Sequence, residues 1–586
     1  MLKRTNTCGE LREKDDGRTV ILNGWVNKKR NLGGLTFIDL RDRYGLTQVV
    51  FDPDVDSDLL NKSKELGHED VIAIRGQVRV RPEEARNPDI QTGDIEVLAQ
   101  SLEVLNTSET LPFMVTDRST ALEDLRLKHR YLDLRTEELQ QTIKTRFQAA
   151  KKVREYLNNL DFFEIETPFL IKSTPEGARD YVVPSRIHRG NFYALPQSPQ
   201  TYKQLLMIAG FDRYYQIVKC FRDEDLRADR QPEFTQIDIE MSFVEESDIM
   251  EMTENMIREI FADIIDVNLP QNFPVMTYDT AIKQYGTDKP DLRFDHPIKT
   301  LNDTVIKSDF RVFTSVVEND GTVAGICVPQ ADHFSRKVID ELTNKARDWG
   351  AKGLAYTKVS EKGLESGIAK FMKPISGELI DIFEAQPGDI IFFVADETKK
   401  TYPLLGHLRN ELANMLDLRG DGFKPVWITE FPLMEWDEVQ ERYIATHHPF
   451  TSVISEDLEK LESSPEKVQA RAYDIVINGY EIGGGSIRNH RVEDQIRMFK
   501  ALNISKDEYD KKFGFLLKAL SYGAPPHGGI ALGFDRLVMI VAGVNNIRDV
   551  IAFPETTSAS SLMTNCPDSI DQDQLKELGL KIRDNK

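Results

Sequence analysis

The chain has 586 residues, enough for about four domains of ordinary size. Apolar residues make up 40% and charged residues 29% of it, a composition that supports folded cores and excludes a wholly disordered protein. The net charge of −21 means that any nucleic-acid surface has to be a local basic patch. No apolar run approaches the roughly 20 residues of a membrane span, and the cysteines lie too far apart to indicate a disulfide framework. We therefore expect a soluble, cytoplasmic protein.

The first hundred residues alternate short strand patterns with turn signals. Strands are expected at 20–26, 35–40, 47–51, 71–80 and 95–98, a spacing typical of a small β-barrel. Between Gly24 and Val50 the basic residues outnumber the acidic ones, and Phe37 and Gln48 lie among them. A basic strand face with an exposed aromatic suits single-stranded nucleic acid. A solvated strand edge protected by Lys and Arg explains the same charges equally well.

Past the barrel, residues 106–135 have the polar, weakly periodic composition of a hinge. A helix with one buried face is expected next, because apolar residues recur there at helical spacing: Phe147, Ala150, Val153, Leu157 and Leu160. It leads into an alternating strand at 162–170 that Pro168 closes. Residues 290–415 indicate a separate α/β block, with strands expected at 310–317, 323–328, 353–356 and 389–395.

The segment 221–240 carries the most informative chemistry. Arg222 and Glu224 lie two residues apart on one face of an expected strand, and a charged turn follows. A second strand then puts alternate side chains on a common face: Phe234, Gln236, Asp238 and Glu240. Arginine offers a bidentate fork to phosphate and Phe234 a ring on which a base can stack, so the pair of strands suits a nucleotide. A salt-bridged, exposed hairpin is the plainer alternative.

A second motif lies at 473–490, where Asp474 and Glu481 lie seven residues apart and are followed by three glycines, Gly483 to Gly485, that are expected to form a turn. Two carboxylates at such a turn suit Mg²⁺, which keeps waters and takes further oxygens from phosphate. Glycines allow the backbone to approach a ligand closely, although loops also use glycine freely.

A third motif, Gly533-Phe534-Asp535-Arg536, lies where an expected strand gives way to a helix. Arg536 can reach the same cleft from there. Alone, such an arginine is more often a surface charge of the helix.

Together, in order and spacing, these segments resemble the three motifs of the class II aminoacyl-tRNA synthetases. The helix with ETPFL resembles motif 1, FRDED to PEF motif 2 and GFDR motif 3. The strings TPEGARDYVVPSR and YALPQSPQTYKQLL are similar to the bacterial-type aspartyl family of subclass IIb. The resemblance implies an α+β multidomain protein. Its parts would be an OB-fold barrel that binds the anticodon (1–105), a hinge (106–135), a catalytic domain on an antiparallel sheet (136–289 and 416–586) and an inserted α/β domain (290–415).

The resemblance also implies an aspartate–tRNA ligase with ATP as substrate and Mg²⁺ as cofactor, in which Arg222 and Arg536 take part in catalysis. ATP would be bound by residues from the second and third motifs and the glycine-rich segment: Arg222, Asp223, Glu224, Gln231, Phe234, Glu481, Gly533, Phe534, Asp535 and Arg536. Asp474 and Glu481 would ligate the metal. Aspartate would be held by Glu176, Gln200, Lys203, Arg222, Asp238, His447, His448 and Arg488. Asparagine would then leave the buried Lys203 and Arg488 uncompensated.

The implied partners are tRNA(Asp), L-aspartate and a second copy of the chain, joined through motif 1 around Pro168, with no membrane. The anticodon would be read by barrel residues Arg30, Leu32, Phe37, Gln48 and Glu96. Two alternatives stay open. A non-discriminating enzyme would also charge tRNA(Asn), and a paralogue that has lost catalysis would bind tRNA only.

Overall fold

The computed structural model describes residues 2–117, 120–174, 178–224, 229–331, 333–438 and 440–583. The chain divides into two compact units, one of residues 1–144 with 548–568 and one of residues 145–547 with 569–586. Across the described ranges, no helix has both the length and the apolar character needed to cross a membrane.

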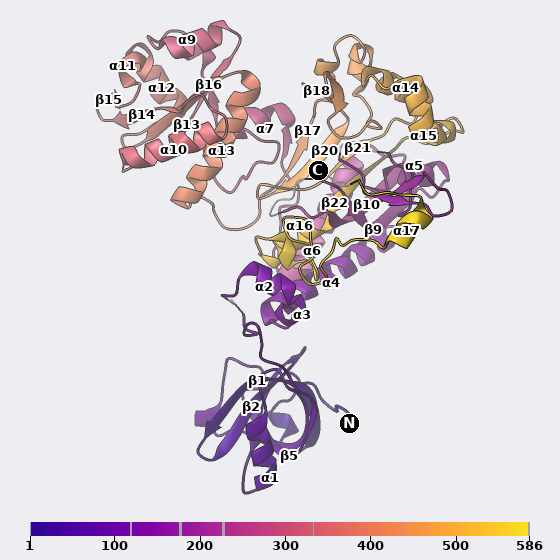
Figure 1. The fold of residues 1–586 in the computed structure, drawn as a ribbon. Coiled ribbons are helices and arrows are strands. Elements are labelled where there is room, and N and C mark those ends of the chain that lie inside the picture. The colour runs from indigo at the N-terminus through magenta and orange to yellow at the C-terminus, as the bar shows by residue number, and fades with distance from the viewer. Residues whose placement is uncertain are drawn as a thin grey trace. The chain divides into compact units, whose positions relative to one another are not determined.

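The first unit contains the predicted barrel (Figure 1). Its strands close in the order β1-β2-β3-β5-β4, with these bounds: β1 (Thr19–Leu32), β2 (Leu35–Asp42), β3 (Gly45–Phe51), β4 (Val71–Val80) and β5 (Ile95–Asn106). Along β2 buried residues alternate with half-buried ones, so one face fills the barrel and the other faces outward. Helix α1 (Ser57–Glu65) contributes Leu59 and Leu60 to the same core.

Short helices follow the barrel in this unit, α2 (Glu123–Lys128) and α3 (Arg130–Asp133). The buried guanidinium of Arg130 pairs with Asp133 at 2.7 Å and donates to the carbonyl oxygens of Arg548, Ile551 and Ala552. These contacts tie the later segment 548–568 to the segment after the barrel.

The second unit is built on an eight-stranded sheet in the order β11-β17-β20-β21-β22-β10-β9-β6. Its strands are β6 (Phe163–Glu164), β9 (Arg213–Phe221), β10 (Glu233–Ser242), β11 (Val275–Thr277), β17 (Pro425–Thr429), β20 (Ala472–Ile477), β21 (Tyr480–Ile487) and β22 (His527–Gly533). The strands from β17 to β9 pair antiparallel, which confirms the expected antiparallel sheet. Only its ends, β11 and β6, pair parallel.

The other elements of this part are short hairpins and helices. The hairpins are β7 (Val182–Pro184) with β8 (Phe192–Ala194) and β18 (Met434–Asp437) with β19 (Arg442–Ala445). The helices are α4 (Glu137–Asn159), which begins in the first unit, α5 (Gln200–Ile208), α6 (Glu246–Ile265), α7 (Tyr278–Tyr285), α14 (Val492–Ala501), α15 (Lys506–Leu520), α16 (Phe534–Ala542) and α17 (Gln572–Leu578). Helix α6 contacts β22, and α16 contacts β10.

The buried face predicted for α4 is partly wrong. Ala149, Val153 and Leu157 are fully buried, but Phe147 is 66% exposed. Phe147 precedes Val153 by six residues, which turns it about 120° away on a helix of 3.6 residues per turn. Leu160 lies beyond the end of the helix.

A five-stranded antiparallel sheet occupies the block between α7 and β17 (Figure 1). Its order is β12-β13-β16-β14-β15, with β12 (Lys299–Thr300), β13 (Thr322–Val328), β14 (Ala355–Ser360), β15 (Gly363–Glu365) and β16 (Ile390–Asp396). Around it are α8 (Asn302–Val305), α9 (Arg311–Glu318), α10 (Arg336–Asp348), α11 (Ala369–Met372), α12 (Ser376–Phe383) and α13 (Thr398–Leu416). Two separate apolar clusters cover this sheet, one with α10 and α13 and one with α8, α9, α11 and α12.

The strand predicted at 310–317 is wrong, because this segment forms α9. Phe313 is buried against the sheet, and Phe310, Val316 and Val317 pack against the same cluster three or four residues away from it, a helical and not an alternating distribution. A short run of aromatic and β-branched residues does not distinguish a strand from a short helix, and packing on the sheet decides here.

Candidate functional site

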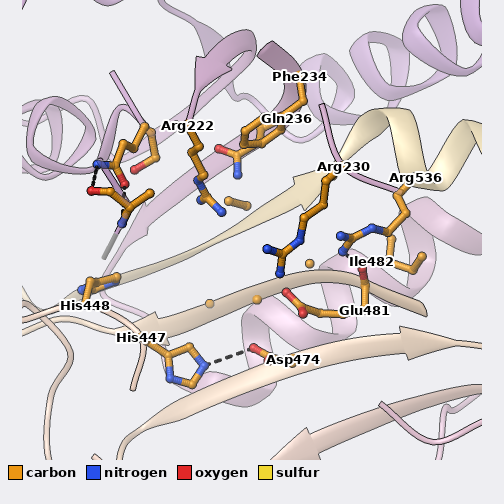
Figure 2. A pocket seen from close by; sticks show the side chains of 18 of the residues that line it. Arg222, Arg230, Phe234, Gln236, His447, His448, Asp474, Glu481, Ile482 and Arg536 are labelled. Atoms are coloured by element: carbon orange, nitrogen blue, oxygen red, sulfur yellow. Dashed lines mark hydrogen bonds and ion pairs between the residues drawn. The ribbon is translucent and has the colours of Figure 1, made fainter. Parts of the chain in front are cut away.

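A cavity of about 470 Å³ opens on the eight-stranded sheet, and most of the predicted residues line it. Figure 2 shows that side chains from strands distant in sequence point into the same space. Its lining includes Gln200 and Lys203 of α5, Phe234 of β10, Asp474 of β20, Glu481 of β21 and Arg536 of α16.

One end of the cavity carries a cation above an aromatic ring. Arg222 follows β9 directly, and its guanidinium carbon lies 5.1 Å from the ring centroid of Phe234. Its Nε is buried and has no hydrogen-bond partner among the described residues. A buried donor without an acceptor is costly, so this geometry favours an anionic ligand.

Two further arginines project into the same space (Figure 2). Arg230 Nη1 lies 3.0 Å from Glu224 Oε2, and Arg536 Nη1 donates to the Glu481 carbonyl oxygen at 2.6 Å. Sequence reasoning missed Arg230, although it stands four residues before Phe234 in the charged turn that was singled out. Three guanidinium groups facing one cavity suit a polyphosphate.

An acidic group lies at the floor of the cavity. Asp474 Oδ1 is 3.3 Å from His447 Nε2, and Glu481 and Asp288 are also among the lining residues. Burial raises the pKa of Asp474; His447 opposes this, and the charges of Glu481 and Asp288 add to it. Sequence reasoning missed Asp288, which carries no motif signal on the segment after α7.

The residues present fit Mg²⁺ only if waters and ligand oxygens supply the rest of its coordination shell. No group of three or more His, Cys, Asp or Glu side chains in the described ranges is arranged to hold a metal by itself. The carboxylates of Asp474 and Glu481 supply the hard oxygen donors that Mg²⁺ prefers, and waters and phosphate oxygens would complete the shell.

The glycine triplet does not form the predicted turn. Gly483, Gly484 and Gly485 lie inside β21, and the turn before that strand is Asn478-Gly479. A Cβ on Gly484 would lie 2.3 Å from Asp474 Oδ1, and one on Gly485 would lie 2.2 Å from the Gly529 carbonyl oxygen. The glycines therefore make room for the acidic group and for the neighbouring strand.

At the other end of the cavity two buried cations meet two buried carboxylates. Lys203 Nζ lies 2.7 Å from Asp238 Oδ1 and 3.3 Å from Glu240 Oε2. Arg488 Nε and Nη2 each donate to Glu240 at 3.0 Å. Burial would raise the pKa of Glu240, but Arg488 and Lys203 outweigh it and lower that pKa; burial raises the pKa of Asp238 although Lys203 opposes it.

This pairing corrects the expectation that asparagine would leave uncompensated cations, because both cations already have carboxylate partners. Arg488 keeps one N–H on Nη2 beyond its hydrogen bonds to the protein. The three donors of Lys203 all face acceptors, but its contacts with Glu240 at 3.3 Å and with the Ile239 carbonyl oxygen at 3.4 Å are long enough for a ligand oxygen to replace one of them. A ligand carboxylate accepts from both, whereas an amide would set its NH₂ group against one of them. Glu240, named on the strand but not as a site residue, orients Arg488.

The pKa values of the two histidines at this end are shifted in opposite directions. Burial lowers the pKa of His447, but Asp474 outweighs it and the net shift is upward. Burial and the charge of Arg488 hold the pKa of His448 well below its ordinary value, and its Nε2 lies 2.6 Å from Arg488 Nη1.

Some predicted residues lie elsewhere. Glu176 is outside the described residues. Phe534 is buried beneath the guanidinium of Arg146 and does not line the cavity. Asp223 and the fully buried Asp238 do not line it either. Asp535 lines it but accepts from the Thr235 backbone N–H at 2.7 Å and from Arg146.

On the barrel, the residues predicted to read nucleic acid share the outer face. Arg30 Nη2 donates to Asp39 at 2.7 Å and to Gln48 at 3.1 Å, and Gln48 donates to Glu96 at 2.7 Å. Phe37 pairs with Arg30 across the β1–β2 ladder and is half-buried. Leu32 is 73% exposed beside the turn Gly33-Gly34, so it does not pack the loop.

Comparisons with known proteins agree with these features. Residues 122–557 match the family described as tRNA synthetases class II (D, K and N), and residues 20–105 match the OB-fold nucleic acid binding domain. The chain is 53% identical to an aspartate–tRNA(Asp/Asn) ligase of Desulfatibacillum aliphaticivorans, over 99% of this chain and 98% of the relative. It is 52% identical to an aspartate–tRNA ligase of Staphylococcus carnosus over the full length of both.

Among solved structures, the asparaginyl-tRNA synthetase of Pyrococcus horikoshii complexed with asparaginyl-adenylate is similar in fold. The TM-score is 0.59 at 20% identity, covering 95% of this chain and 99% of that one.

Proposed function

The chain belongs to the class II tRNA synthetases of the D, K and N group, and from this membership we propose that it is an aspartate–tRNA ligase. One observation carries the proposal: the same cavity is lined by three arginines, Arg222, Arg230 and Arg536, and by two buried cations, Lys203 and Arg488, that pair with carboxylates. The first set suits the phosphates of ATP and the second suits the side-chain carboxylate of aspartate.

In the first reaction an α-carboxylate oxygen of aspartate attacks the α-phosphorus of ATP, and pyrophosphate leaves. No protein nucleophile is needed, because positioning and neutralisation of the growing phosphate charge supply the catalysis. Arg222 holds the α-phosphate and the reacting carboxylate, Phe234 stacks on the adenine, and Arg536 covers its other side. Mg²⁺, held by Asp474 and Glu481, would neutralise further phosphate charge.

In the second reaction the terminal adenosine hydroxyl of tRNA(Asp) attacks the carbonyl carbon of the aspartyl-adenylate, and AMP leaves. The barrel (1–105) binds the anticodon through Arg30, Leu32, Phe37, Gln48 and Glu96. A hinge (106–135) joins it to the catalytic domain (136–289 and 416–586), which carries an inserted domain (290–415).

The chain acts as a homodimer in the cytoplasm, where ATP and tRNA are available. The support for a dimer is a set of exposed apolar side chains in and after β6, since Phe163, Leu170 and Phe169 are 60%, 53% and 44% exposed. Sedimentation of the intact chain at micromolar concentration tests this: two copies are expected, and a monomer would contradict it.

Relatives at the same identity include ligases named for tRNA(Asp) alone and ligases named for tRNA(Asp/Asn). We favour the discriminating form because the exposed Leu32 offers no hydrogen bond to a second base. Charging of purified tRNA(Asp) and tRNA(Asn) tests this. Strong preference for tRNA(Asp) supports it, equal charging indicates the non-discriminating form, and binding without charging would indicate a non-catalytic paralogue.

A further inference from the structure

Three side chains behind the cavity are joined by hydrogen bonds, and the proposed chemistry gives a role to only one of them, Gln200. His527, at the start of β22, contacts Gln204 of α5, and Gln204 contacts Gln200 one helical turn earlier. His527 and Gln204 are fully buried and Gln200 is 4% exposed. Gln200 alone of the three lines the cavity.

The direction of these hydrogen bonds, from donor to acceptor, follows from the His527 end. His527 Nδ1 lies 2.8 Å from the carbonyl oxygen of Pro525. A carbonyl oxygen only accepts, so Nδ1 carries the hydrogen. Burial lowers the pKa of His527, which favours the neutral imidazole with a lone pair on Nε2.

Each following contact is then fixed in direction. His527 Nε2 lies 3.2 Å from the amide nitrogen of Gln204, which therefore donates to it. The amide oxygen of Gln204 is turned to the other side, where it accepts from the amide nitrogen of Gln200 at 3.4 Å. Within the described part of the chain Gln200 Oε1 receives no donor, so this oxygen is the atom that Gln200 offers to a ligand.

The imidazole is held in place by the sheet itself. The carbonyl oxygen of His527 accepts from the Arg488 backbone N–H at 2.9 Å, and His527 is paired with Ser242 in the β10–β22 ladder. The side chains of Gln200 and Gln204 lie four residues apart and so on one face of α5. His527 on β22 and both glutamines on α5 therefore belong to rigid elements.

We propose that His527 is a positioning residue that acts through Gln204 to turn the amide oxygen of Gln200 toward the α-ammonium group of the bound amino acid. With the opposite tautomer, the Gln200 amide would reverse and present its NH₂ group to a cation. The inference rests on the proposed function for the amino-acid end of the cavity. His527 does not touch the substrate.

The test measures ATP–pyrophosphate exchange by the full-length enzyme with His527→Gln, His527→Leu and Gln204→Met. His527→Leu and Gln204→Met are expected to raise KM for aspartate about 10- to 100-fold, the value of one hydrogen bond to a charged group, with KM for ATP unchanged. His527→Gln keeps an acceptor that can face Gln204 and should restore most of the affinity.

Succinate is the matched probe, because it has both carboxylates of aspartate and no ammonium group. Its inhibition constant against aspartate should be the same in wild type and variants. A parallel loss of aspartate and succinate binding would mean a merely structural role and would overturn the inference. If wild-type enzyme shows no aspartate-dependent exchange, the proposed function fails instead.

A measurement on the wild-type protein keeps the inference testable if the variants do not fold. In protein labelled with ¹⁵N-histidine, the His527 signal should show protonated Nδ1 and unprotonated Nε2. An Nε2–H tautomer or an imidazolium at neutral pH would overturn it.

Discussion

At the residue scale, the side chains that line the cavity are of two kinds: some are free to contact a ligand, and others hold their neighbours in place. The guanidinium of Arg222 lies above Phe234, and its buried Nε has no partner among the residues that the structure describes, so its charge is available to a phosphate. Asp535 stands in the third motif beside Arg536, yet both its oxygens are engaged by the protein. Sequence motifs mark both residues, and only the contacts distinguish their roles.

We predict that Arg222→Ala lowers the rate of aspartate-dependent ATP–pyrophosphate exchange by at least about 10²-fold, the value of one positioned donor to a transition-state charge. Arg347→Ala is the matched control, because Arg347 is exposed on α10 and does not line the cavity. Both variants should unfold at the wild-type temperature. Near-normal exchange by Arg222→Ala would remove this residue from the mechanism.

Asp535→Ala should act on stability. It removes two hydrogen bonds from a buried carboxylate and leaves the Thr235 N–H unsatisfied, which costs about 1.5–3 kcal/mol per bond to a charged group. Urea unfolding of the variant measures this loss. An unchanged midpoint together with weaker ATP binding would mean that Asp535 is a ligand residue instead.

At the element scale, the β1–β2 hairpin shows how local sequence builds a binding face. Gly33 and Gly34 both have positive φ, 60° and 84°, and a two-residue turn of this kind matches the twist of the strands it joins. The turn fixes the register that sets Arg30 opposite Phe37. The side chains from Arg30 through Gln48 to Glu96 are already joined by hydrogen bonds before any ligand arrives.

Arg30→Ala should leave exchange unchanged and weaken charging of tRNA(Asp), by about 1–3 kcal/mol if Arg30 makes a bidentate contact to a base. Charging of tRNAs with altered anticodons provides the comparison. An equal loss for every anticodon would make Arg30 a phosphate contact and not a reader.

Leu32→His should reduce the ratio of charging efficiencies between tRNA(Asp) and tRNA(Asn) toward one, because imidazole both donates and accepts. Its side chain is 73% exposed, so the substitution should leave the melting temperature unchanged. The idea fails if wild type already charges both tRNAs equally, or if the variant keeps the wild-type ratio.

At the scale of the whole molecule, the sequence was sufficient wherever a local pattern carries the structure. The barrel strands and the pair β9–β10 follow from alternation, and Arg222, Phe234, Asp474 and Arg536 do line one cavity. The cluster of Lys203, Asp238, Glu240 and Arg488 was harder to predict from the sequence, because its members come from α5, β10 and the end of β21. Segments distant in sequence pack together and pair Lys203 and Arg488 with carboxylates, and no local sequence pattern predicts these pairs.

The same limit explains the other differences. Helix α9 depends on the sheet beneath it. Asp288 lines the cavity, and His527 contacts Gln204 behind it, only because segments distant in sequence pack on the same eight-stranded sheet.

The central claim is that this cavity activates aspartate and rejects its amide. Exchange of labelled pyrophosphate into ATP by the wild-type chain, with aspartate and asparagine at equal concentrations, tests it most directly. We expect exchange with aspartate and none above background with asparagine, because an amide sets its NH₂ group against Lys203 or Arg488. Equal exchange with asparagine, or no exchange with aspartate, would contradict the account.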